Sequence, residues 1–379
     1  MIIVTVNSGS TSTKIAAFDA PSAAVPDVAV SDGKKLSPIA YERYAGAMEP
    51  GEALAAFGRA LAGRHMQAVA HRVVHGGMRF TAPVRIDAAV ESLLDELSEL
   101  APLHNPVAVR WIRAARAHFD PKVVHVAAFD TAFFARLPRV AAEYALPTAL
   151  GTAQGVRRYG FHGLAHEAMW RRWRDLYPRI ERPRIITLQL GGGCSAAAIR
   201  DGQPIDTSMG FSPLEGLVMA TRSGDLDASV VPYLARRLGC AGDDVVERLN
   251  REAGLLGLSG NTSEMSRLIE DASPEAQFAV DMYCYRARKY VGAYLAALGG
   301  CDGIIFGGGV GEHVPDVRAR ILRDMAWAGI ALDPCANECA RRGEARIGAA
   351  ESRVAVDVIP PDEEHSLVEA AVGLMASRG

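Results

Sequence analysis

The stretches VTVNSGSTSTKIAAF at residues 4–18 and ITLQLGGGCSAAAI at residues 186–199 follow one pattern. Each has an apolar run, a tight turn rich in Gly or Ser, and a second apolar run, which predicts two antiparallel strands joined by a short turn. A single copy is weak evidence, because Gly-rich hairpins are common. Two copies about 180 residues apart indicate that one α/β domain has been duplicated.

A third stretch, IIFGGGVGEH at residues 304–313, also joins an apolar strand to a Gly-rich turn, and a helix is predicted after Pro315. Small residues in such turns let backbone N–H groups approach phosphate oxygens, and the N-terminus of a helix adds a favourable dipole. The P-loop pattern GxxxxGK[ST] is absent from the sequence. The three turns therefore predict a phosphate-binding site of another kind.

The rest of the chain alternates short apolar runs with longer amphipathic ones, which predicts an α/β fold with helices covering the sheets. Helices are predicted from Asp87 as N-cap, from Asn105 as N-cap ahead of a proline, and over residues 274–298. Segments near residues 21–36 and 146–155 are predicted loops, the second a candidate linker. Buried strands are predicted at residues 2–6, 68–73, 123–128, 184–190, 303–306 and 354–358.

The composition is that of an ordinary globular protein. Of 379 residues, 49% are hydrophobic and 22% are charged, and the net charge is -3. This charge argues against a broad electrostatic surface for nucleic acid or an anionic membrane, so neither is an expected partner. No apolar stretch reaches the roughly 20 residues that span a bilayer, and MIIVTVNSGS lacks the basic start of a signal peptide. We expect a cytoplasmic protein whose six scattered cysteines, with no CxxC pair, are reduced thiols.

Four segments combine polar or charged residues with turn residues and are candidates for a functional site. They are AHRVVHGG at 70–77, APLHNP at 101–106, RRYGFHGLAH at 157–166 and DTSMGFSPLEGLVMATRSGD at 206–225. Acidic candidates follow two predicted strands: Asp130 in AAFDTAF, and Glu363 with Glu364 in IPPDEEH. Arginines can neutralise phosphoryl oxygens and carboxylates can hold Mg2+, so together these residues favour phosphoryl transfer.

Each of these residues also has a purely structural interpretation. Arg72 follows a buried strand, and its anionic partner could be a structural carboxylate as easily as a substrate. Asp130 and Glu363 could be helix caps. His162 and His166 have the spacing of metal ligands on a helix, but a glycine stands where the HExxH motif has glutamate, so a zinc site is not predicted.

Taken together, the motifs resemble those of the acetate kinase family. VNSGSTSTK is similar to the amino-terminal signature of the family, RYGFHGLAH resembles its second signature, and DTSMGFSPLEGLVMATRSGD is nearly the family's form throughout. HRVVHGG, APLHNP, FDTAF, GLLGLSG, GVGEH and IPPDEE also match in order. The resemblance runs from residue 3 to about residue 364, which is almost the whole chain.

The resemblance implies the fold of the sugar kinase, Hsp70 and actin superfamily: two duplicated ribonuclease H-like (actin-like ATPase) α/β domains flanking a nucleotide cleft. The expected domains are residues 1–147, completed by a C-terminal helix at 363–379, and residues 148–362, which would carry nucleotide-binding and dimer elements. The implied activity is reversible transfer of the γ-phosphoryl group of ATP to acetate, giving acetyl phosphate and ADP. Mg2+ or Mn2+ is the implied metal, and a homodimer is the implied assembly.

The resemblance also implies roles for individual residues. Arg72 and Arg222 would bind the carboxylate and the transferring phosphoryl group, His162 would stabilise the transition state, and Asp130 would serve the metal and orient the substrate. A carboxylate is ionised at pH 7 and needs no general base, so we expect direct in-line transfer without a phosphoenzyme. The other implied site residues are Asn7 and Glu363 for the metal; Val74, Leu103, His104, Phe161 and Pro213 for the substrate; and Asn7, Ser10, Ser12, Lys14, Gln189, Gly191, Gly192, Gly193, Glu264, Met265, Ser266, Gly308, Gly309, Val310, Gly311, Glu312 and His313 for the nucleotide and its phosphates.

The chain departs from the family pattern on the nucleotide side. Gln189 and Gly192 stand where the family usually has histidine and asparagine. Ser266 stands where arginine is usual, with Glu264 in place of aspartate, and His313 replaces asparagine. Neutral variation is one interpretation. The alternatives are GTP or pyrophosphate as the donor, propionate or another short-chain acid as the acceptor, and a non-catalytic nucleotide-binding switch.

Overall fold

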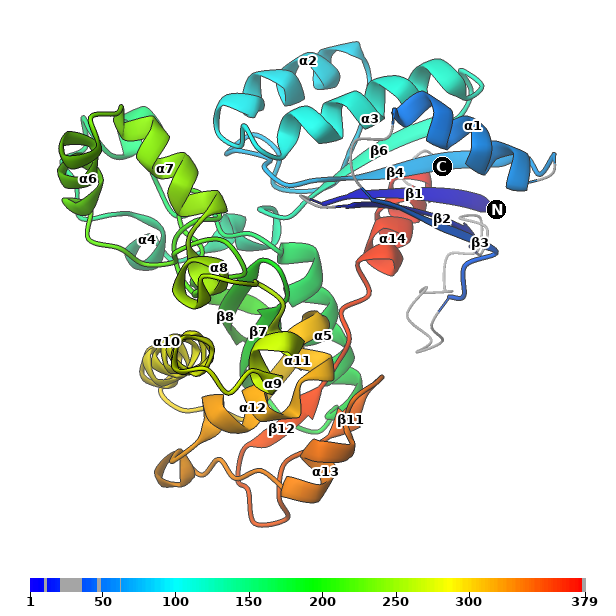
Figure 1. Cartoon of the computed structure of the whole chain (residues 1–379). Helices are drawn as coiled ribbons and strands as arrows, with labels where there is room; N and C mark the ends of the chain where they lie inside the picture. Colours follow the sequence, from blue (N-terminus) through cyan, green and yellow to red (C-terminus); the bar gives the residue numbers. More distant parts are fainter. Residues whose placement is uncertain (10–11, 21–35, 46–48, 62, 377–379) are drawn as a thin grey trace. The chain divides into compact units, whose positions relative to one another are not determined.

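The computed structural model describes residues 1–9, 12–20, 36–45, 49–61 and 63–376. The chain divides into two compact units. Unit 1 comprises residues 1–135, 161–168 and 362–379, and unit 2 comprises residues 136–160 and 169–361. Each unit contains one six-stranded mixed sheet (Figure 1).

Six strands form the sheet of each unit. In unit 1 they are β1 (Ile2–Ser8), β2 (Ser12–Asp19), β3 (Ala40–Ala45), β4 (Met66–Val73), β5 (Val84–Arg85) and β6 (Val124–Phe129). In unit 2 they are β7 (Arg184–Leu190), β8 (Cys194–Arg200), β9 (Gln203–Thr207), β10 (Gly303–Gly307), β11 (Ala345–Arg346) and β12 (Ala355–Val358).

The two sheets have the same topology. The strand order is β3-β2-β1-β4-β6-β5 in unit 1 and, read from the corresponding edge, β9-β8-β7-β10-β12-β11 in unit 2. From this edge, the first two pairings are antiparallel, the next two are parallel and the last is antiparallel in both sheets. The duplication predicted from the two hairpins is therefore confirmed. In the hairpins themselves Asn7 pairs with Lys14, and Gln189 pairs with Ser195.

Fourteen α-helices accompany the strands among the described residues. In the first part of the chain they are α1 (Pro50–Ala60), α2 (Ala88–Glu96), α3 (Asn105–His118), α4 (Arg139–Ala142) and α5 (Gly163–Leu176). In the remainder they are α6 (Val230–Leu238), α7 (Gly242–Arg251), α8 (Gly254–Ser259), α9 (Met265–Glu270), α10 (Pro274–Leu298), α11 (Gly308–His313), α12 (Pro315–Leu322), α13 (Pro334–Cys339) and α14 (Glu363–Ala376).

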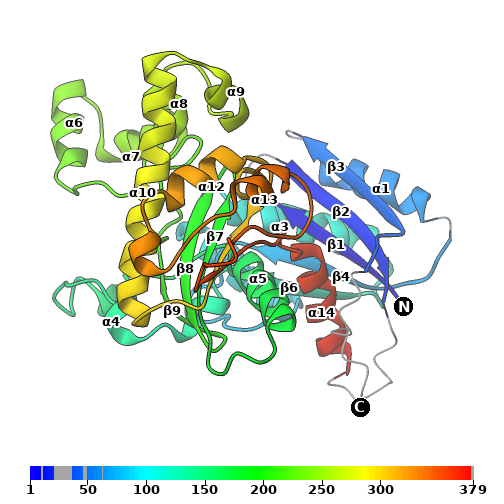
Figure 2. The same ribbon diagram turned by 90° about the horizontal axis from the view of Figure 1, so that it is seen from below.

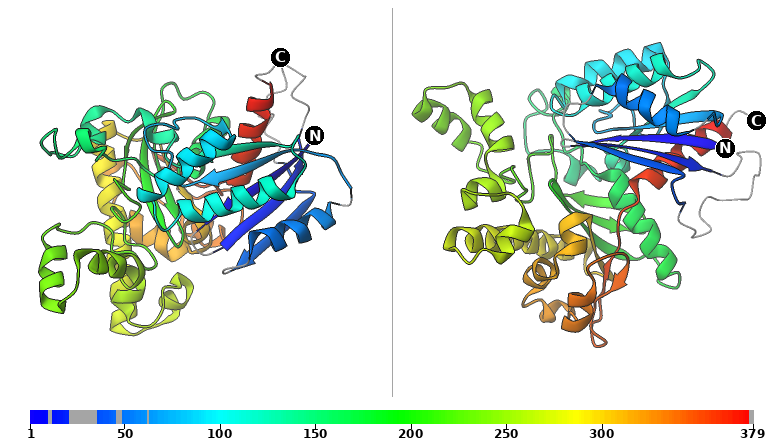
Figure 3. Two further views of the ribbon diagram at one scale, coloured as in Figure 1. Left: turned by 90° about the horizontal axis from the view of Figure 1, so that it is seen from above. Right: turned by 45° about the vertical axis from the view of Figure 1, so that its right-hand side comes forward.

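Helices cover both faces of the unit 1 sheet, as the right-hand view of Figure 3 shows. Helices α1 and α3 pack on one face, where Val4, Val6 and Ile15 meet Phe57 and Trp111. Helix α14 packs on the other face, where the alternate residues of the same strands point. Strand residues alternate between two faces, so a sheet buried on both sides is apolar at nearly every position. This explains why the strands could be recognised as continuous apolar runs.

The long helix α10 runs beside β8 in unit 2 (Figure 2). It begins and ends where the sequence predicted, with the side chain of Ser273 accepting from the N–H of Ala276 at its start and Gly299 in the left-handed region at its end. No helix among the described residues is long and apolar enough to cross a membrane. All six cysteines are free thiols, as expected.

Helix starts were predicted with mixed success. Asp87 is the N-cap of α2, and its side chain accepts from Val90. The prediction of Asn105 as N-cap of α3 is wrong by one residue, since α3 begins at Asn105 and its N-cap is His104. The side-chain amide of Asn105 is used for a tertiary contact instead, described below.

Other differences concern boundaries. Five strands, β1, β4, β6, β10 and β12, differ from the predicted ranges by one or two residues at their ends, and β7 matches its range. The Gly-rich stretch after β10 forms the short helix α11 before α12 starts at Pro315. The compact units also differ in detail from the expected domains: residues 136–147 group with unit 2, and residues 161–168 group with unit 1. The candidate linker at 146–155 lies inside unit 2, and the predicted loop at 21–36 lies almost wholly outside the described residues.

Candidate functional site

Side chains from three neighbouring strands meet in unit 1. Asn7 lies near the end of β1, Arg72 lies near the end of β4, and Asp130 directly follows β6. These strands are adjacent and parallel, so their carboxyl ends lie at one edge of the sheet, where α/β proteins usually bind ligands. Glu363, the first residue of α14, joins them.

Arg72 is held in a carboxylate fork. Its Nε and Nη2 donate to the two carboxylate oxygens of Asp130 over 2.9 and 2.6 Å. Its Nη1 donates to Oδ1 of Asn7 over 3.1 Å and lies 3.7 Å from Oε2 of Glu363. A bidentate pair of this kind sets the orientation of the guanidinium as well as its position. The structural carboxylate considered from the sequence is therefore present, and it is Asp130.

Two carboxylates converge on the amide of Asn7. Its Nδ2 donates to Oε2 of Glu363 over 2.8 Å and to Oε1 of Glu364 over 3.3 Å. Nζ of Lys14, the residue opposite Asn7 in the hairpin, lies 3.4 Å from the same oxygen of Glu364. Ser12 accepts from Arg43 over 3.3 Å at the start of β2, and Ser10 lies outside the described residues.

Burial and charge act in opposite directions on these groups. Burial lowers the pKa of Arg72, but the carboxylates of Asp130 and Glu363 outweigh it and raise the pKa overall. Burial raises the pKa of Glu363, but Arg72 and the Asn7 amide outweigh it and lower the pKa overall. For Asp130, which is fully buried, burial outweighs Arg72 and leaves the pKa raised. The cluster thus combines a permanently cationic guanidinium with two carboxyl groups of different basicity.

Neither Asp130 nor Glu363 acts as a helix cap. In α14 the capping bond is made by Asp362, whose Oδ1 accepts from the N–H of His365 over 3.0 Å. The carboxylate oxygens of Asp130 accept hydrogen bonds from Arg72 and from the backbone N–H of His162. Both acidic side chains therefore face the cluster.

His162 is positioned by its backbone. Its φ of 58° is in the left-handed region, which is uncommon for a residue with a Cβ and often marks a functional position. The next N–H, that of Gly163, donates to the carbonyl of Asp130 over 2.9 Å. A Cβ on Gly163 would lie 2.1 Å from that carbonyl oxygen, so only glycine fits. Helix α5 begins at Gly163, after His162, so the two histidines do not form the helical pair that a zinc motif would need.

The amide of Asn105 clamps the loop that follows β4. Its Oδ1 accepts from the backbone N–H of His75 over 3.1 Å, and its Nδ2 donates to the carbonyl of His75 over 2.9 Å. This contact ties the start of α3, with Leu103 and His104, to the residue after Val74. Asn105 is fully buried, so water cannot take its place as the hydrogen-bond partner of the two backbone groups of His75. The sequence motif APLHNP identified the place but not this role.

The apolar residues expected around the acyl group are placed in both units. Val74 and Phe161 are buried in unit 1, and the ring of Phe161 lies edge-on to His75 with centroids 5.5 Å apart. Leu103 is 39% exposed and lies at the surface of the same unit. Pro213 belongs to unit 2, where its carbonyl accepts from Nη1 of Arg222 over 3.2 Å.

Arg222 lies in unit 2 in the loop of residues 208–225, which forms the first 18 residues of the connection between β9 and α6. Besides the bond to Pro213, its Nη1 lies 3.9 Å from the sulfur of Met219. Burial lowers the pKa of this guanidinium, in contrast to that of Arg72. The structure thus brings together Arg222 and Pro213, two residues of one motif.

The same loop contacts the Gly-rich turn between β7 and β8. The N–H of Ala220 donates to the carbonyl of Gly192 over 3.1 Å, and the thiol of Cys194 donates to the carbonyl of Gly191 over 3.3 Å. The turn closes through a bond from Gly191 N–H to the carbonyl of Gly193 over 3.1 Å. Oε1 of Gln189, at the end of β7, is buried and has no hydrogen-bond partner among the described residues.

The second Gly-rich turn of unit 2 leads into α11. Gly308 has φ 75°, and a Cβ there would lie 2.5 Å from the carbonyl of Leu190, whereas Gly309 has open space around it. Arg318 of α12 is fully buried and donates to the carbonyls of Gly311 and Glu312 at the end of α11 over 2.8 and 3.0 Å. Val310 is half-buried in this short helix.

Two further predicted nucleotide-side residues lie at the surface of unit 2. His313 is exposed, and its Nδ1 is 2.6 Å from the carbonyl of Arg341. Glu264 is the N-cap residue of α9 and forms an ion pair of 2.6 Å with Arg267. Met265 is buried, while Ser266 is exposed beside it.

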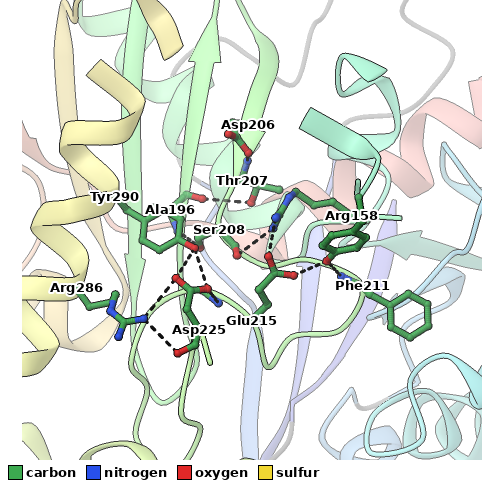
Figure 4. Close-up of polar contacts among 12 residues, drawn as sticks. Arg158, Ala196, Asp206, Thr207, Ser208, Phe211, Glu215, Asp225, Arg286 and Tyr290 are labelled. Carbon is green, nitrogen blue, oxygen red and sulfur yellow. Dashed lines mark hydrogen bonds and ion pairs between the residues drawn. The ribbon is translucent and has the colours of Figure 1, made fainter. Parts of the chain in front are cut away.

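Sequence analysis singled out Glu215 and Asp225 only as polar residues of a motif, and it missed their partners. Glu215 accepts from Arg158 over 2.6 Å and from Tyr144, and Asp225 accepts from Tyr290 (Figure 4). Arg158 is the first residue of the RYGFHG motif, which is the one sequence signal for it. The distant tyrosines have none.

Each unit contains a sheet of the same topology whose central strands are parallel. An arginine–carboxylate cluster lies at the carboxyl edge of one sheet, and Gly-rich turns lie at the carboxyl edge of the other. Together these features define a phosphoryl-transfer enzyme of the actin-like ATPase fold. The chain belongs to the acetokinase family, whose model matches residues 2–369. It is therefore a kinase.

Similar proteins agree with this assignment. The chain is 47% identical over 305 residues to an acetate kinase from Chloroherpeton thalassium, which covers 79% of this chain and 73% of the relative. The crystal structure of Porphyromonas gingivalis acetate kinase superposes with a TM-score of 0.86 at 33% identity, covering 99% of both chains. A propionate kinase from Francisella tularensis superposes with a TM-score of 0.84 at 31% identity, covering 97% of this chain and 98% of that one.

Proposed function

We propose that this protein transfers the γ-phosphoryl group of ATP to acetate, reversibly, to give acetyl phosphate and ADP. The observation that carries the proposal is the Arg72 cluster, in which a buried guanidinium is fixed beside carboxylates at the ligand-binding edge of the unit 1 sheet. The family and the relatives named acetate kinase support the choice of substrates.

Arg72 and Arg222 would supply the positive charge that the reaction needs. A carboxylate oxygen of acetate attacks the γ-phosphorus, the bond from that phosphorus to the β,γ-bridging oxygen breaks, and ADP leaves. Both reactants are anions, so their mutual repulsion is the main obstacle and fixed cations lower it. Asp130 would orient Arg72, and His162 would donate to the equatorial oxygens of the transferring group. No proton needs to be removed from acetate at neutral pH.

Asn7 and Glu363, with Glu364 beside them, fit the requirements of Mg2+. The two carboxylates converge on one amide nitrogen, at 2.8 and 3.3 Å, and all three side chains offer oxygen ligands. Among the described residues, no group of three or more His, Cys, Asp or Glu side chains could hold a metal ion. Mg2+ is commonly bound by one or two carboxylates together with water and substrate phosphates. When bound, the ion would neutralise phosphate charge.

The two Gly-rich turns of unit 2 are the proposed phosphate and nucleotide contacts. Gly192 and Gly309 have open space where a Cβ would stand, so backbone N–H groups there are accessible to an anion. Lys14 and Ser12 would add contacts from the hairpin of unit 1. Glu264, Met265, Ser266 and His313 remain proposals for the adenosine side.

We also propose that the chain forms a homodimer. Unit 2 exposes several large apolar side chains that a second copy of the chain could bury. Light scattering coupled to size exclusion tests this directly, and a monomeric mass would refute it. The exposed side chains include Leu226, Tyr233, Leu238, Val246, Phe278, Tyr285 and Trp327.

The test of the function is a hydroxamate-trapping assay with acetate and propionate, each with ATP, GTP or pyrophosphate and Mg2+. We expect ATP and acetate to give the highest kcat/KM. Propionate is the second candidate acceptor, because a propionate kinase is among the similar structures, and one methylene is worth only about 1–3 kcal/mol in an apolar pocket. Turnover with another donor alone would contradict the choice of ATP, and no turnover with any pair would refute carboxylate phosphorylation.

A further inference from the structure

The loop of residues 208–225 carries Arg222 and Pro213, yet it contains no helix or strand of its own. A connection of this length within a compact unit is usually functional and must be held by its side chains. Its first residue is tied to the sheet: the N–H of Ser208 donates to the carbonyl of Ala196 over 2.9 Å, and Oγ of Ser208 accepts from the N–H of Ala196 over 2.9 Å. Beyond this point, two carboxylates hold the loop.

Glu215 is the first of these carboxylates. Its Oε1 accepts from Nη2 of Arg158 over 2.6 Å, and its Oε2 accepts from the hydroxyl of Tyr144. The same hydroxyl accepts from the loop N–H of Phe211 over 2.8 Å, and Nη1 of Arg158 donates to the carbonyl of Ser208 over 3.2 Å. The guanidinium of Arg158 also lies over the Tyr144 ring, 5.6 Å from its centroid. The carboxylate of Glu215 thus holds the first half of the loop in place (Figure 4).

Asp225 is the second carboxylate. Its Oδ1 accepts from the N–H of Gly216 over 2.9 Å, while its own N–H donates to the carbonyl of Gly216 over 3.0 Å. The hydroxyl of Tyr290 in α10 lies 2.9 and 3.1 Å from its two oxygens, and Nη1 of Arg286 lies 3.5 Å from Oδ2. These bonds close residues 216–225 into a ring that contains Arg222.

Three glycines of the loop pack closely against this network. A Cβ on Gly210 would lie 1.7 Å from Oε2 of Glu215, and a Cβ on Gly224 would lie 2.5 Å from the carbonyl of Gly216. Gly216 itself has φ 110°, which side chains rarely allow. The glycines therefore fit the same conformation that the two carboxylates hold.

A pocket of about 400 Å3 opens beside this network, and Tyr144, Glu215 and Asp225 are among its lining residues. The carboxylates of Glu215 and Asp225 are both used by partners from the protein itself. Both carboxylates therefore have partners within the protein, and no cationic ligand is needed to account for their presence.

We propose that Glu215 and Asp225 are positioning residues for Arg222: they act on phosphoryl transfer by fixing the loop that presents this guanidinium. The inference rests on the proposed role of Arg222. Glu215 is the better residue to test, because Glu215→Gln keeps the shape of the side chain and removes only the charge that holds Arg158 and Tyr144.

The experiment compares Glu215→Gln, Tyr144→Phe and Arg222→Ala with the double variant Glu215→Gln/Arg222→Ala in the full-length enzyme. Asp302→Asn is the matched control, since it removes a carboxylate held by Arg184 over 3.0 Å elsewhere in unit 2. We expect Glu215→Gln to lower kcat/KM for acetate by about 10–100-fold, the usual effect of displacing a group by about 1 Å. KM for ATP should stay within about twofold, because the Gly-rich turns keep their own bonds.

The double variant gives the decisive result. If Glu215 acts through Arg222, the double variant is no slower than Arg222→Ala, because there is no guanidinium left to position. Tyr144→Phe should show a smaller loss of the same kind, and Asp302→Asn should change the melting temperature but not kcat/KM. A full multiplicative loss in the double variant would overturn the inference, as would a Glu215→Gln enzyme with unchanged kcat/KM. An Arg222→Ala enzyme with full turnover would instead refute the proposed role of Arg222 in the mechanism, and that result is visible in the single variant alone.

Discussion

The two units share one sheet topology but hold their arginines in different ways. In unit 1, Arg72 extends from a strand and is bonded by side chains, chiefly the carboxylate of Asp130. In unit 2, Arg222 belongs to a loop without regular structure, which is held at other residues by Glu215 and Asp225. The pKa of Arg72 is raised by its carboxylates despite burial, and that of Arg222 is lowered by burial. A duplicated fold can thus place the same chemical group by direct pairing or by shaping the backbone around it.

The largest expected effects come from replacing each arginine by alanine, because Arg72 is held by direct pairing and Arg222 by the shape of its loop. We expect both variants to lose about 10²–10³-fold or more in kcat/KM. Arg72→Ala should also lower the free energy of unfolding by about 3–5 kcal/mol, because it leaves the buried Asp130 without its cation. Arg222→Ala should change it by less than about 1 kcal/mol, because removing a guanidinium whose burial is unfavourable offsets the lost contacts. Urea denaturation and steady-state kinetics measure both.

The double variant Arg72→Ala/Asp130→Ala provides the control for that comparison. It should regain most of the lost stability without regaining activity, since the fully buried carboxylate of Asp130 is no longer left without its cation. Equal losses of stability in Arg72→Ala and Arg222→Ala would break the comparison.

The close fit of Gly163 against Asp130 offers a test that leaves every charge in place. Gly163→Ala puts a Cβ 2.1 Å from the Asp130 carbonyl oxygen, so the segment that carries His162 must move. We expect a loss of about 1–3 kcal/mol in stability and about 10–100-fold in kcat. Gly373→Ala, in α14 of the same unit with open space around it, is the matched control and should be neutral or slightly stabilising. A fully active Gly163→Ala enzyme would show that His162 is not positioned through this contact.

The smallest expected effect is a difference between the units in their response to acid. In unit 1, burial lowers the pKa of His71, and it lowers those of His75 and His125 to about 4. Nε2 of His71 lies 3.2 Å from Nδ1 of His125, so the pair cannot accept two protons without repulsion. The unfolded chain protonates near pH 6.5, so this contribution to stability is complete above that pH and is lost as the pH falls toward 4.

Unit 2 should respond with the opposite sign. Burial raises the pKa of Asp357 to about 6, despite bonds from Tyr177 and Trp173. The contribution of Asp357 to the stability of unit 2 is therefore fully present below the pKa of about 4 that the side chain has in the unfolded chain. It is lost as the pH rises through about 6. Hydrogen exchange of peptides from β4 and β6 against peptides from β7 and β10 at pH 7.5 and 5 would measure each unit, with His125→Asn and Asp357→Asn as the matched variants. If a fall in pH lowered the protection of both units equally, the opposite pKa shifts of these histidines and of Asp357 would be contradicted.

Much of the fold could be predicted from the chain because burial on both faces of a sheet leaves a direct mark on the sequence. The paired hairpins, the apolar strands and α10 with its Ser273 and Gly299 ends were all recognisable locally. Strand ends were less certain, since they depend on which partner residues continue the ladder. Asn105 shows the limit: its type and place suggest an N-cap, but its amide is used by the backbone of His75, 30 residues away.

The sequence by itself determined the family, the order of the motifs and the residues that could carry charge, because these depend on which residue types occur and in what spacing. Only the tertiary structure decided what each charge is paired with. The fork between Arg72 and Asp130, the convergence of Glu363 and Glu364 on Asn7, and the hydrogen bonds of Tyr144 and Arg158 to Glu215 join residues 57 to 357 positions apart. Such contacts follow from the order of strands in the sheet and from the path of a loop, and no local pattern records them.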